Sequence, residues 1–257
     1  MITSTIVQPS HEFSTSFKAR AAGFFWLMTI ITGMFGFIAG TKFIVLGDAA
    51  ATASNIMSHE SLYRWAIASN VIATACYLVV TVLIYELLKR INRTVATLGL
   101  VFSLVGCAAG TVACLLLFPA LNLLGGVQYL GAFSTEQLQA QALNFLTLSL
   151  QVNDIGMALF GIHVLTIGYL IRRSTFLPKF LGALLLVTSV CYLANSFANF
   201  LALPFKSYLL PFVALSGLVG EGMLTGWLLV KGVNVQRWHE QAKADKSSPV
   251  MTESVAD

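Results

Sequence analysis

The chain contains six stretches of apolar residues, each about 20 residues or longer and separated by short polar segments. They lie at approximately residues 22–40, 65–87, 95–118, 140–171, 178–202 and 208–231. About 20 apolar residues allow a helix to cross roughly 30 Å of hydrocarbon. Because lipid offers no hydrogen-bond partners to an open backbone, each stretch is predicted to be helical. The pattern therefore predicts an all-α fold, a polytopic integral membrane bundle of about six transmembrane helices.

The composition excludes a soluble domain of this size. Of the 257 residues, 57% are hydrophobic and only 10% are charged, whereas soluble globular domains carry about 25% charged residues. So few charged side chains cannot cover the surface of a soluble protein. The lipid bilayer is therefore the partner that the composition predicts.

The Lys and Arg residues cluster at the ends of the apolar stretches, which is typical of a membrane topology signal. If both termini are cytoplasmic, only Lys42, Arg64 and Lys206 of the 15 basic residues lie outside. The inner side then holds Lys18, Arg20, Lys89, Arg90, Arg93, Arg172, Arg173, Lys179, Lys231, Arg237, Lys243 and Lys246. This asymmetry predicts an even number of spans with both termini in the cytoplasm. It does not form the basic stripe of a nucleic-acid-binding protein, so no nucleic-acid partner is expected.

The domain organisation follows from the same pattern. We expect a polar cytoplasmic segment at 1–20, a six-helix transmembrane domain at 21–233 and a disordered cytoplasmic tail at 234–257, where apolar residues are scarce. The first apolar stretch lacks the features of a cleaved leader and is predicted to remain as the first helix. Asp48 is predicted to cap a short helix near the outer surface. Ser134 and Gln137 resemble a capping box that begins a fourth helix too long merely to span the membrane.

Ionisable residues are costly inside a membrane and are the first candidates for function. Four lie within or at the ends of the apolar stretches: Glu86, Asp154, His163 and Glu221. Glu86 is spaced to form an interfacial ion pair with Lys89 and Arg90. Asp154 is placed near the outer boundary, where it either caps local structure or lines an outer vestibule.

His163 and Glu221 are predicted to lie at similar depths, close to the middle of the membrane. A buried carboxyl group must be protonated or paired, and a histidine can supply the partner. One hypothesis is therefore a contact between His163 and Glu221 that joins the fourth and sixth helices. The alternative is two separate residues, each bonded to a Ser, Thr, Tyr or backbone partner that holds the bundle together.

Further polar residues gather in the outer half of the predicted bundle. The fifth helix carries a polar stripe at spacings of 0, 3, 4 and 7, formed by Tyr192, Asn195, Ser196 and Asn199. Residues at similar depths on other helices are Asn70, Gln151, Asn153 and Asp154. Two interpretations remain open, a polar pocket that faces outward and a set of interhelical hydrogen bonds without a pocket.

The sequence offers little support for metal or cofactor chemistry. The four cysteines lie inside apolar stretches and form no Cys-x-x-Cys pair, which is typical of small buried packing residues. The phosphate-binding loop, the His-Glu-x-x-His motif and the Gly-x-Ser-x-Gly motif do not occur in the sequence. We therefore predict no metal site and no cofactor, and a non-enzymatic function is favoured.

Five stretches together resemble a known family. They are GDAAATASNIMSHESLYRWAIASN at 47–70, LLKRINRTVATLGLVFSLVG at 87–106, YLGAFSTEQLQAQALNFL at 129–146, GIHVLTIGYLIRRSTFLPKFLGALL at 161–185 and GEGMLTGWLLVKGV at 220–233. Over residues 18–235 the chain is similar to the uncharacterised, mainly bacterial membrane family DUF4386. The resemblance implies a multi-pass protein of the bacterial cytoplasmic (inner) membrane and supplies no activity.

Three functions remain open from the sequence. The first is binding or transport of a small-molecule ligand through an outward-facing polar pocket, with candidate residues His163, Glu221, Asp154, Asn153, Tyr192, Asn195, Asn199 and Asn70. The second is a non-catalytic partner in a membrane complex. The third is an intramembrane enzyme that uses His163 or Glu221. A pocket above about 300 Å³ that reaches Glu221 favours the first, and a fully paired interior favours the second.

Overall fold

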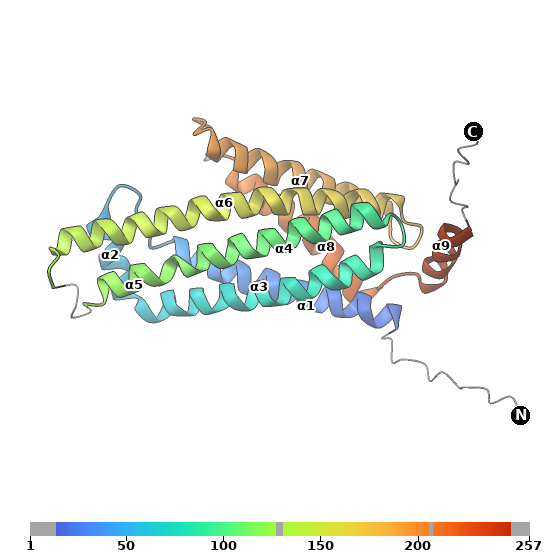
Figure 1. Ribbon diagram of the computed structural model, residues 1–257, viewed down its shortest axis with the longest axis horizontal. Coiled ribbons are helices and arrows are strands. Elements are labelled where there is room, and N and C mark those ends of the chain that lie inside the picture. The colour runs from blue at the N-terminus through green and yellow to red at the C-terminus, as the bar shows by residue number, and fades with distance from the viewer. Residues whose placement is uncertain (1–13, 127–130, 206–207, 248–257) are drawn as a thin grey trace, which may run out of the picture.

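The computed structural model describes residues 14–126, 131–205 and 208–247, and these residues form nine α-helices (Figure 1). In chain order they are α1 (Thr15–Thr41), α2 (Ala49–Ser58), α3 (Glu60–Leu88), α4 (Arg93–Leu115), α5 (Leu117–Leu124), α6 (Thr135–Arg173), α7 (Lys179–Phe200), α8 (Leu210–Val230) and α9 (Val235–Ser247). Six helical segments are long and apolar enough to cross a membrane: α1, α3, α4 with α5, α6, α7 and α8. The predicted all-α membrane fold is confirmed.

The observed helix boundaries follow local capping chemistry. Asp48 accepts a hydrogen bond from the Ala51 amide at 2.8 Å and begins α2, as predicted. Ser134 and Gln137 form both hydrogen bonds of the predicted capping box. The third predicted span divides into α4 and α5, because Pro119 has no amide hydrogen to continue the helix.

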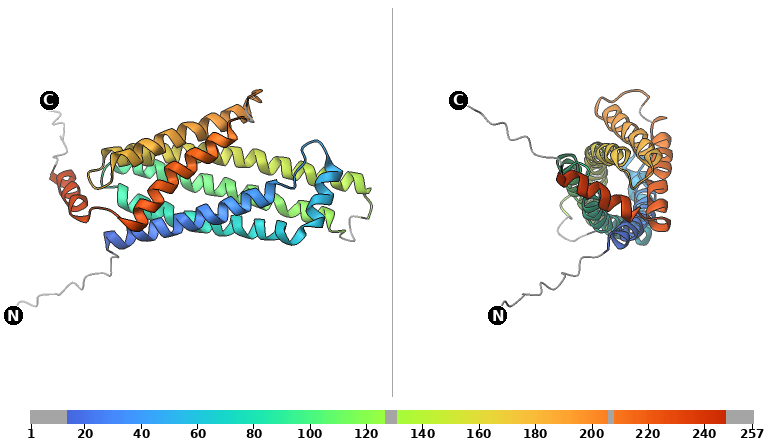
Figure 2. Two further views of the ribbon diagram at one scale, coloured as in Figure 1. Left: turned by 180° about the vertical axis from the view of Figure 1, so that it is seen from behind. Right: turned by 90° about the vertical axis from the view of Figure 1, so that its right-hand side faces the viewer.

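The six spanning segments form a closed ring in chain order. Each packs on the next, from α1 through α3, α4, α6 and α7 to α8, and α8 packs back against α1. Figure 2 (right) shows the ring from the end that carries α9. We call this the terminal end, because α1 begins there, and the end with α2 and α5 the distal end (Figure 1).

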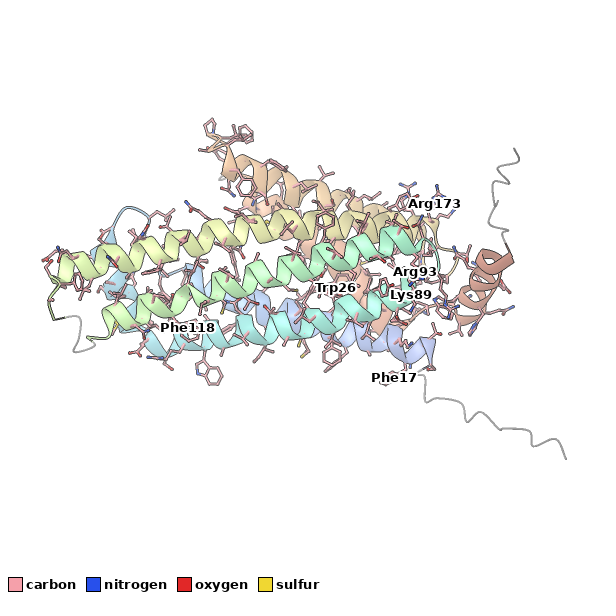
Figure 3. All side chains as sticks on the ribbon, in the orientation of Figure 1. Phe17, Trp26, Lys89, Arg93, Phe118 and Arg173 are labelled. Carbon is pink, nitrogen blue, oxygen red and sulfur yellow. The ribbon has the colours of Figure 1, made fainter. Side chains whose placement is uncertain are left out.

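Basic residues mark the terminal end, where Lys89, Arg93 and Arg173 lie near α9 (Figure 3). Glu86 pairs with Lys89 at 2.5 Å and with Lys18 at 3.7 Å. The predicted pairing of Glu86 with Arg90 is wrong. The Arg90 guanidinium instead lies 4.3 Å from the ring centre of Trp238 in α9. Helix spacing could not have predicted the position of Trp238.

The predicted disordered tail requires a correction, because residues 235–247 form α9. Trp238 is buried and donates its indole N–H to the Leu87 carbonyl at 3.0 Å. Gln241 accepts hydrogen bonds from the amide and the hydroxyl of Thr175. One buried indole thus docks a polar helix on the bundle. At the other terminus α1 begins at Thr15, inside the predicted segment 1–20. The rest of both predicted terminal segments, 1–13 and 248–257, lies outside the described residues.

Two buried hydrophobic clusters hold the ring together. The larger lies in the terminal half and includes Trp26, Tyr77 and Leu185. The smaller lies in the distal half and includes Ile56 and Leu146. Members of both clusters line a central cavity, which therefore lies where the two clusters meet.

Candidate functional site

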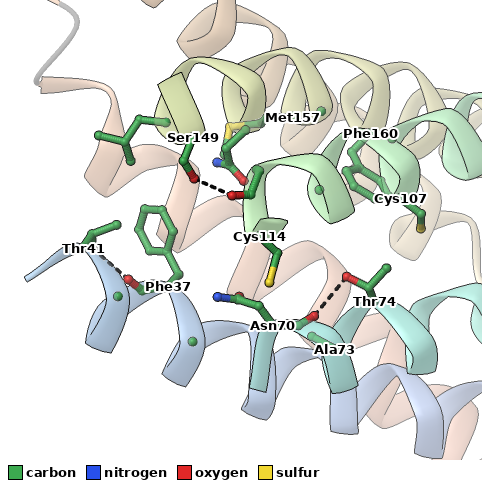
Figure 4. A pocket seen from close by; sticks show the side chains of 18 of the residues that line it. Phe37, Thr41, Asn70, Ala73, Thr74, Cys107, Cys114, Ser149, Met157 and Phe160 are labelled. Carbon is green, nitrogen blue, oxygen red and sulfur yellow. Dashed lines mark hydrogen bonds between the residues drawn. The ribbon is translucent and has the colours of Figure 1, made fainter. Parts of the chain in front are cut away.

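The ring encloses a cavity of about 340 Å³ that is partly open to its surroundings. Residues from all six spanning segments line it. In Figure 4 its walls include Phe37 of α1, Asn70 of α3, Cys114 of α4 and Met157 of α6. The lining is largely apolar, and its hydroxyl, amide and carboxyl side chains are Thr29, Thr41, Asn70, Thr74, Tyr77, Ser149, Asn153, Tyr192 and Glu221. A mostly apolar cavity with a few convergent polar groups is typical of a small-molecule site.

The cavity extends along the bundle from the distal end toward the middle. At one end its lining includes Thr41 and Ile44, at the distal end of α1. At the other it includes Thr29 and Glu221. Glu221 thus lines a space that continues toward the distal end.

Two hydrogen bonds fix the Glu221 carboxyl group. The Tyr192 hydroxyl of α7 donates to Oε1 at 2.7 Å, and the Trp26 indole N–H of α1 donates to Oε2 at 3.0 Å. Gly217 lies one turn earlier in α8, and a Cβ atom there would be 2.6 Å from the Tyr192 hydroxyl oxygen. The absence of a side chain at Gly217 therefore gives the tyrosine room to reach the carboxyl group.

Tyr77 of α3 completes an aromatic group beside this carboxyl. Its ring packs edge-to-face on Trp26 with centroids 6.0 Å apart, and on Phe160 at 5.1 Å. Edge-to-face pairs of this kind are favourable and hold the rings in fixed orientations. Tyr77, Phe160 and Tyr192 also line the cavity, so Glu221 lies among aromatic side chains.

The hypothesis of a contact between His163 and Glu221 is wrong. No hydrogen bond or ion pair joins these two described residues; His163 Nδ1–H donates to the Gly99 carbonyl of α4 at 2.7 Å. Its Nε2 is buried without a partner. The Tyr77 ring packs on both His163, at 5.9 Å, and the Trp26 that binds Glu221. The alternative, of two residues each bonded to a Ser, Thr, Tyr or backbone partner, describes His163 on the Gly99 carbonyl and Glu221 on the Tyr192 hydroxyl. Trp26 is a further partner of Glu221 that the alternative did not include.

The polar stripe of the fifth span divides between two surroundings. Tyr192 lines the cavity. Asn195 contacts Met157 Sδ at 3.5 Å, and Asn199 donates to Asp154 at 3.3 Å, both across the contact between α6 and α7. The stripe therefore supplies one cavity residue, Tyr192, and two contacts between α6 and α7. Its fourth member, Ser196, is buried, and its hydroxyl has no hydrogen-bond partner among the described residues.

The eight predicted site residues accordingly separate into two groups. The cavity lining includes Asn70, Asn153, Tyr192 and Glu221. The lining does not include His163, Asp154, Asn195 or Asn199. Sequence reasoning missed Trp26 and Tyr77. A tryptophan buried in a membrane span usually finds a partner for its indole N–H, and that requirement is the signal that could have pointed to Trp26, which donates to Glu221. Tyr77 joins the site through its ring contacts with Trp26 and Phe160, which no signal in the sequence indicates.

The described part of the chain contains no group of three His, Cys, Asp or Glu side chains arranged to hold a metal ion. Cys107 and Cys114 line the cavity, and all four cysteines are free thiols. The site therefore consists of one carboxyl group, its two hydrogen-bond donors, and amide, hydroxyl and apolar walls.

Comparison with known proteins places this architecture in a family. A domain of unknown function, DUF4386, matches residues 21–232, which include all six spanning segments except the first six residues of α1. The chain belongs to the DUF4386 family. The family description assigns no activity, and the cavity is the feature of this DUF4386 protein that bears on its function.

The individual matches are few. An uncharacterised protein of Archaeoglobus fulgidus is 32% identical over 87 residues, which are 34% of this DUF4386 chain and 50% of that relative. The match thus spans half of the relative's length. No solved structure matches the chain significantly.

Proposed function

We propose that this DUF4386 protein binds a small, largely apolar molecule in its central cavity, as a membrane binding or transport protein does. One observation supports the proposal: residues of all six spanning segments line a cavity of about 340 Å³, and this cavity reaches Glu221. Its volume falls within the range of about 300–1,000 Å³ found for ligand pockets. The apolar lining favours the body of the ligand, and the few polar groups orient it.

A purely structural role in a membrane complex predicts a filled interior with paired polar groups. The cavity favours binding instead, because its Asn70 and Asn153 side chains lie at the wall of an accessible space. Internal glycines and a carboxyl group in the middle of the membrane are also typical of transporter sites. Gly106, Gly110 and Gly156 line the same cavity.

The cavity can be filled by one substitution. A Cβ atom at Gly110 would meet no atom within 4 Å, although Gly110 lines the cavity. We expect Gly110→Leu to fold normally and to block the cavity. Reaction of Cys107 and Cys114 with the neutral reagent 2-hydroxyethyl methanethiosulfonate, measured by mass spectrometry with Cys76 and Cys191 replaced by Ser, should fall at least about tenfold.

The matched control is Gly226→Leu, because Gly226 is also a helical glycine with open space around it but is absent from the cavity lining. This variant should react as the parent protein does. Unreactive thiols in the parent, or equal reaction in Gly110→Leu, would show that small molecules do not enter the cavity. Compounds that bind there should protect Cys107 from the reagent.

We also propose that the protein lies in the bacterial cytoplasmic membrane with both termini in the cytoplasm, so that the distal end and the cavity face outward. The support is the basic cluster at the terminal end. A tag at the C-terminus should react with an impermeant reagent only after the cells are permeabilised. Labelling in intact cells would reverse the assigned orientation and the direction in which the cavity faces.

A further inference from the structure

We infer that the cavity selects a monovalent organic cation, a protonated amine or quaternary ammonium group on a small apolar body, with Glu221 as its counter-ion. This inference rests on the proposed function and names the ligand class of the same site. It follows from the charge, the hydrogen bonding and the aromatic surroundings of Glu221.

The first observation concerns charge. Among the described residues that line the cavity, Glu221 is the only Asp, Glu, Lys, Arg or His. The ion pairs found in the described chain join Lys18 and Lys89 to Glu86 and Arg64 to Glu60, all outside the cavity. A carboxylate within a membrane requires a compensating charge or a proton. A cationic ligand supplies the compensating charge that the cavity walls lack.

The second observation concerns the oxygens of the carboxyl group. Trp26 and Tyr192 each donate one hydrogen bond, one to each oxygen. A carboxylate has about four acceptor positions, so both oxygens retain capacity for a further donor. The two donors are uncharged and hold the group in place without neutralising it. An ammonium N–H group approaching from the cavity would donate to one of these positions, whereas a quaternary ammonium group would supply its charge without a hydrogen bond.

The third observation concerns the walls beside the carboxyl group. Tyr77, Phe160 and Tyr192 line the cavity, and aromatic faces attract organic cations. Apolar side chains including Leu146, Leu150 and Met157 line it as well. This surface suits an apolar body attached to the cationic group.

An inorganic divalent cation fits the site less well. Calcium and magnesium take about six or more oxygen ligands, commonly from several carboxylates or water molecules. The cavity offers one carboxylate, and the described chain has no cluster of three metal-binding side chains. One negative charge among aromatic rings therefore favours a singly charged cation on an organic body, such as an alkylammonium ion.

The test compares three compounds that share a phenyl ring and a short chain but differ in charge: 2-phenylethylammonium, 2-phenylethanol and phenylacetate. Their dissociation constants are measured by isothermal titration calorimetry on the full-length protein in a neutral detergent at pH 7. We expect the ammonium to bind about tenfold or more tightly than the alcohol, because a charged hydrogen bond is gained. Phenylacetate should bind most weakly.

Two matched variants locate the source of this preference. Glu221→Gln keeps the size of the side chain and removes its charge, so the advantage of the ammonium over the alcohol should be lost. Glu86→Gln makes the same change at the terminal end, outside the cavity, and should keep the preference. If Glu221→Gln does not fold, the order of the three compounds on the unmodified protein decides alone.

The inference is overturned if the alcohol or phenylacetate binds as tightly as the ammonium, or if the preference persists in Glu221→Gln. If the alcohol binds and protects Cys107 but the ammonium binds no more tightly than the alcohol, the inference fails and the proposed function is still supported. Failure of all three compounds to bind also overturns the inference. The Gly110→Leu thiol experiment then decides separately whether the cavity admits small molecules.

Discussion

Gly182→Ala is expected to destabilise the protein by about 3 kcal/mol, because the new methyl group would enter a backbone-to-backbone contact. A Cβ atom at Gly182 in α7 would lie 2.6 Å from the Gly168 carbonyl oxygen and 2.9 Å from the Arg172 amide nitrogen, both in α6. These are backbone atoms of a helix and cannot move independently. The two helices must separate, which reduces packing along their whole contact. Denaturant unfolding in detergent micelles measures the loss.

Gly226→Ala is the matched control for this prediction. Gly226 also lies within a spanning helix, but a Cβ atom there would meet no atom within 4 Å. Its replacement should leave stability unchanged or raise it by about 0.5–1 kcal/mol, since alanine is the better helix former. Equal effects at the two positions would contradict the close approach of α6 and α7.

Trp238→Ala is expected to release α9 from the bundle and to cost about 3–5 kcal/mol in the free energy of the docked state. The substitution removes a buried indole, its hydrogen bond to the Leu87 carbonyl and the ring beneath the Arg90 guanidinium. Hydrogen exchange of residues 235–241, followed by mass spectrometry, should become fast in the variant. The exchange of α3 and α6 near the middle of the bundle should be unaffected.

The control makes the same change at an exposed tryptophan. Trp65 is 63% exposed, whereas Trp238 is 8% exposed. Trp65→Ala should therefore change the exchange of α9 by no more than the experimental error, because substitutions away from buried contacts have small effects. Slow exchange of α9 in Trp238→Ala would show that other contacts, such as those of Gln241, dock the helix.

Some features of the candidate site could be predicted from helical spacing. Distance to the helix ends predicted outer-half positions for Asn70, Asn153 and Tyr192, and all three line the cavity. Spacing gives depth because each residue advances a helix by about 1.5 Å. It does not give rotation about the helix axis relative to neighbours. Asn195 lies three residues from Tyr192 on the same helix face, yet it contacts Met157 instead of the cavity.

The pairing of Glu221 shows the same limit. The similar predicted depths of His163 and Glu221 made the two residues reasonable partners. Every helix in the ring, however, has residues at that depth. The structure places α1 and α7 on either side of α8, so Trp26 and Tyr192 reach the carboxyl group. The helix of His163, α6, packs on α4 and α7 instead.

By itself the sequence determined the membrane class, the six spans, the basic end of the bundle and the local caps at Asp48 and Ser134, because hydrophobic length, charge placement and capping depend on residues close together in the chain. Tertiary structure alone decided the order of helices around the ring, the partners of Glu221 and His163, the cavity and the docking of α9. These features depend on contacts between residues far apart in the chain, such as Trp26 with Glu221 and Leu87 with Trp238. Local periodicity carries no information about which helix faces which.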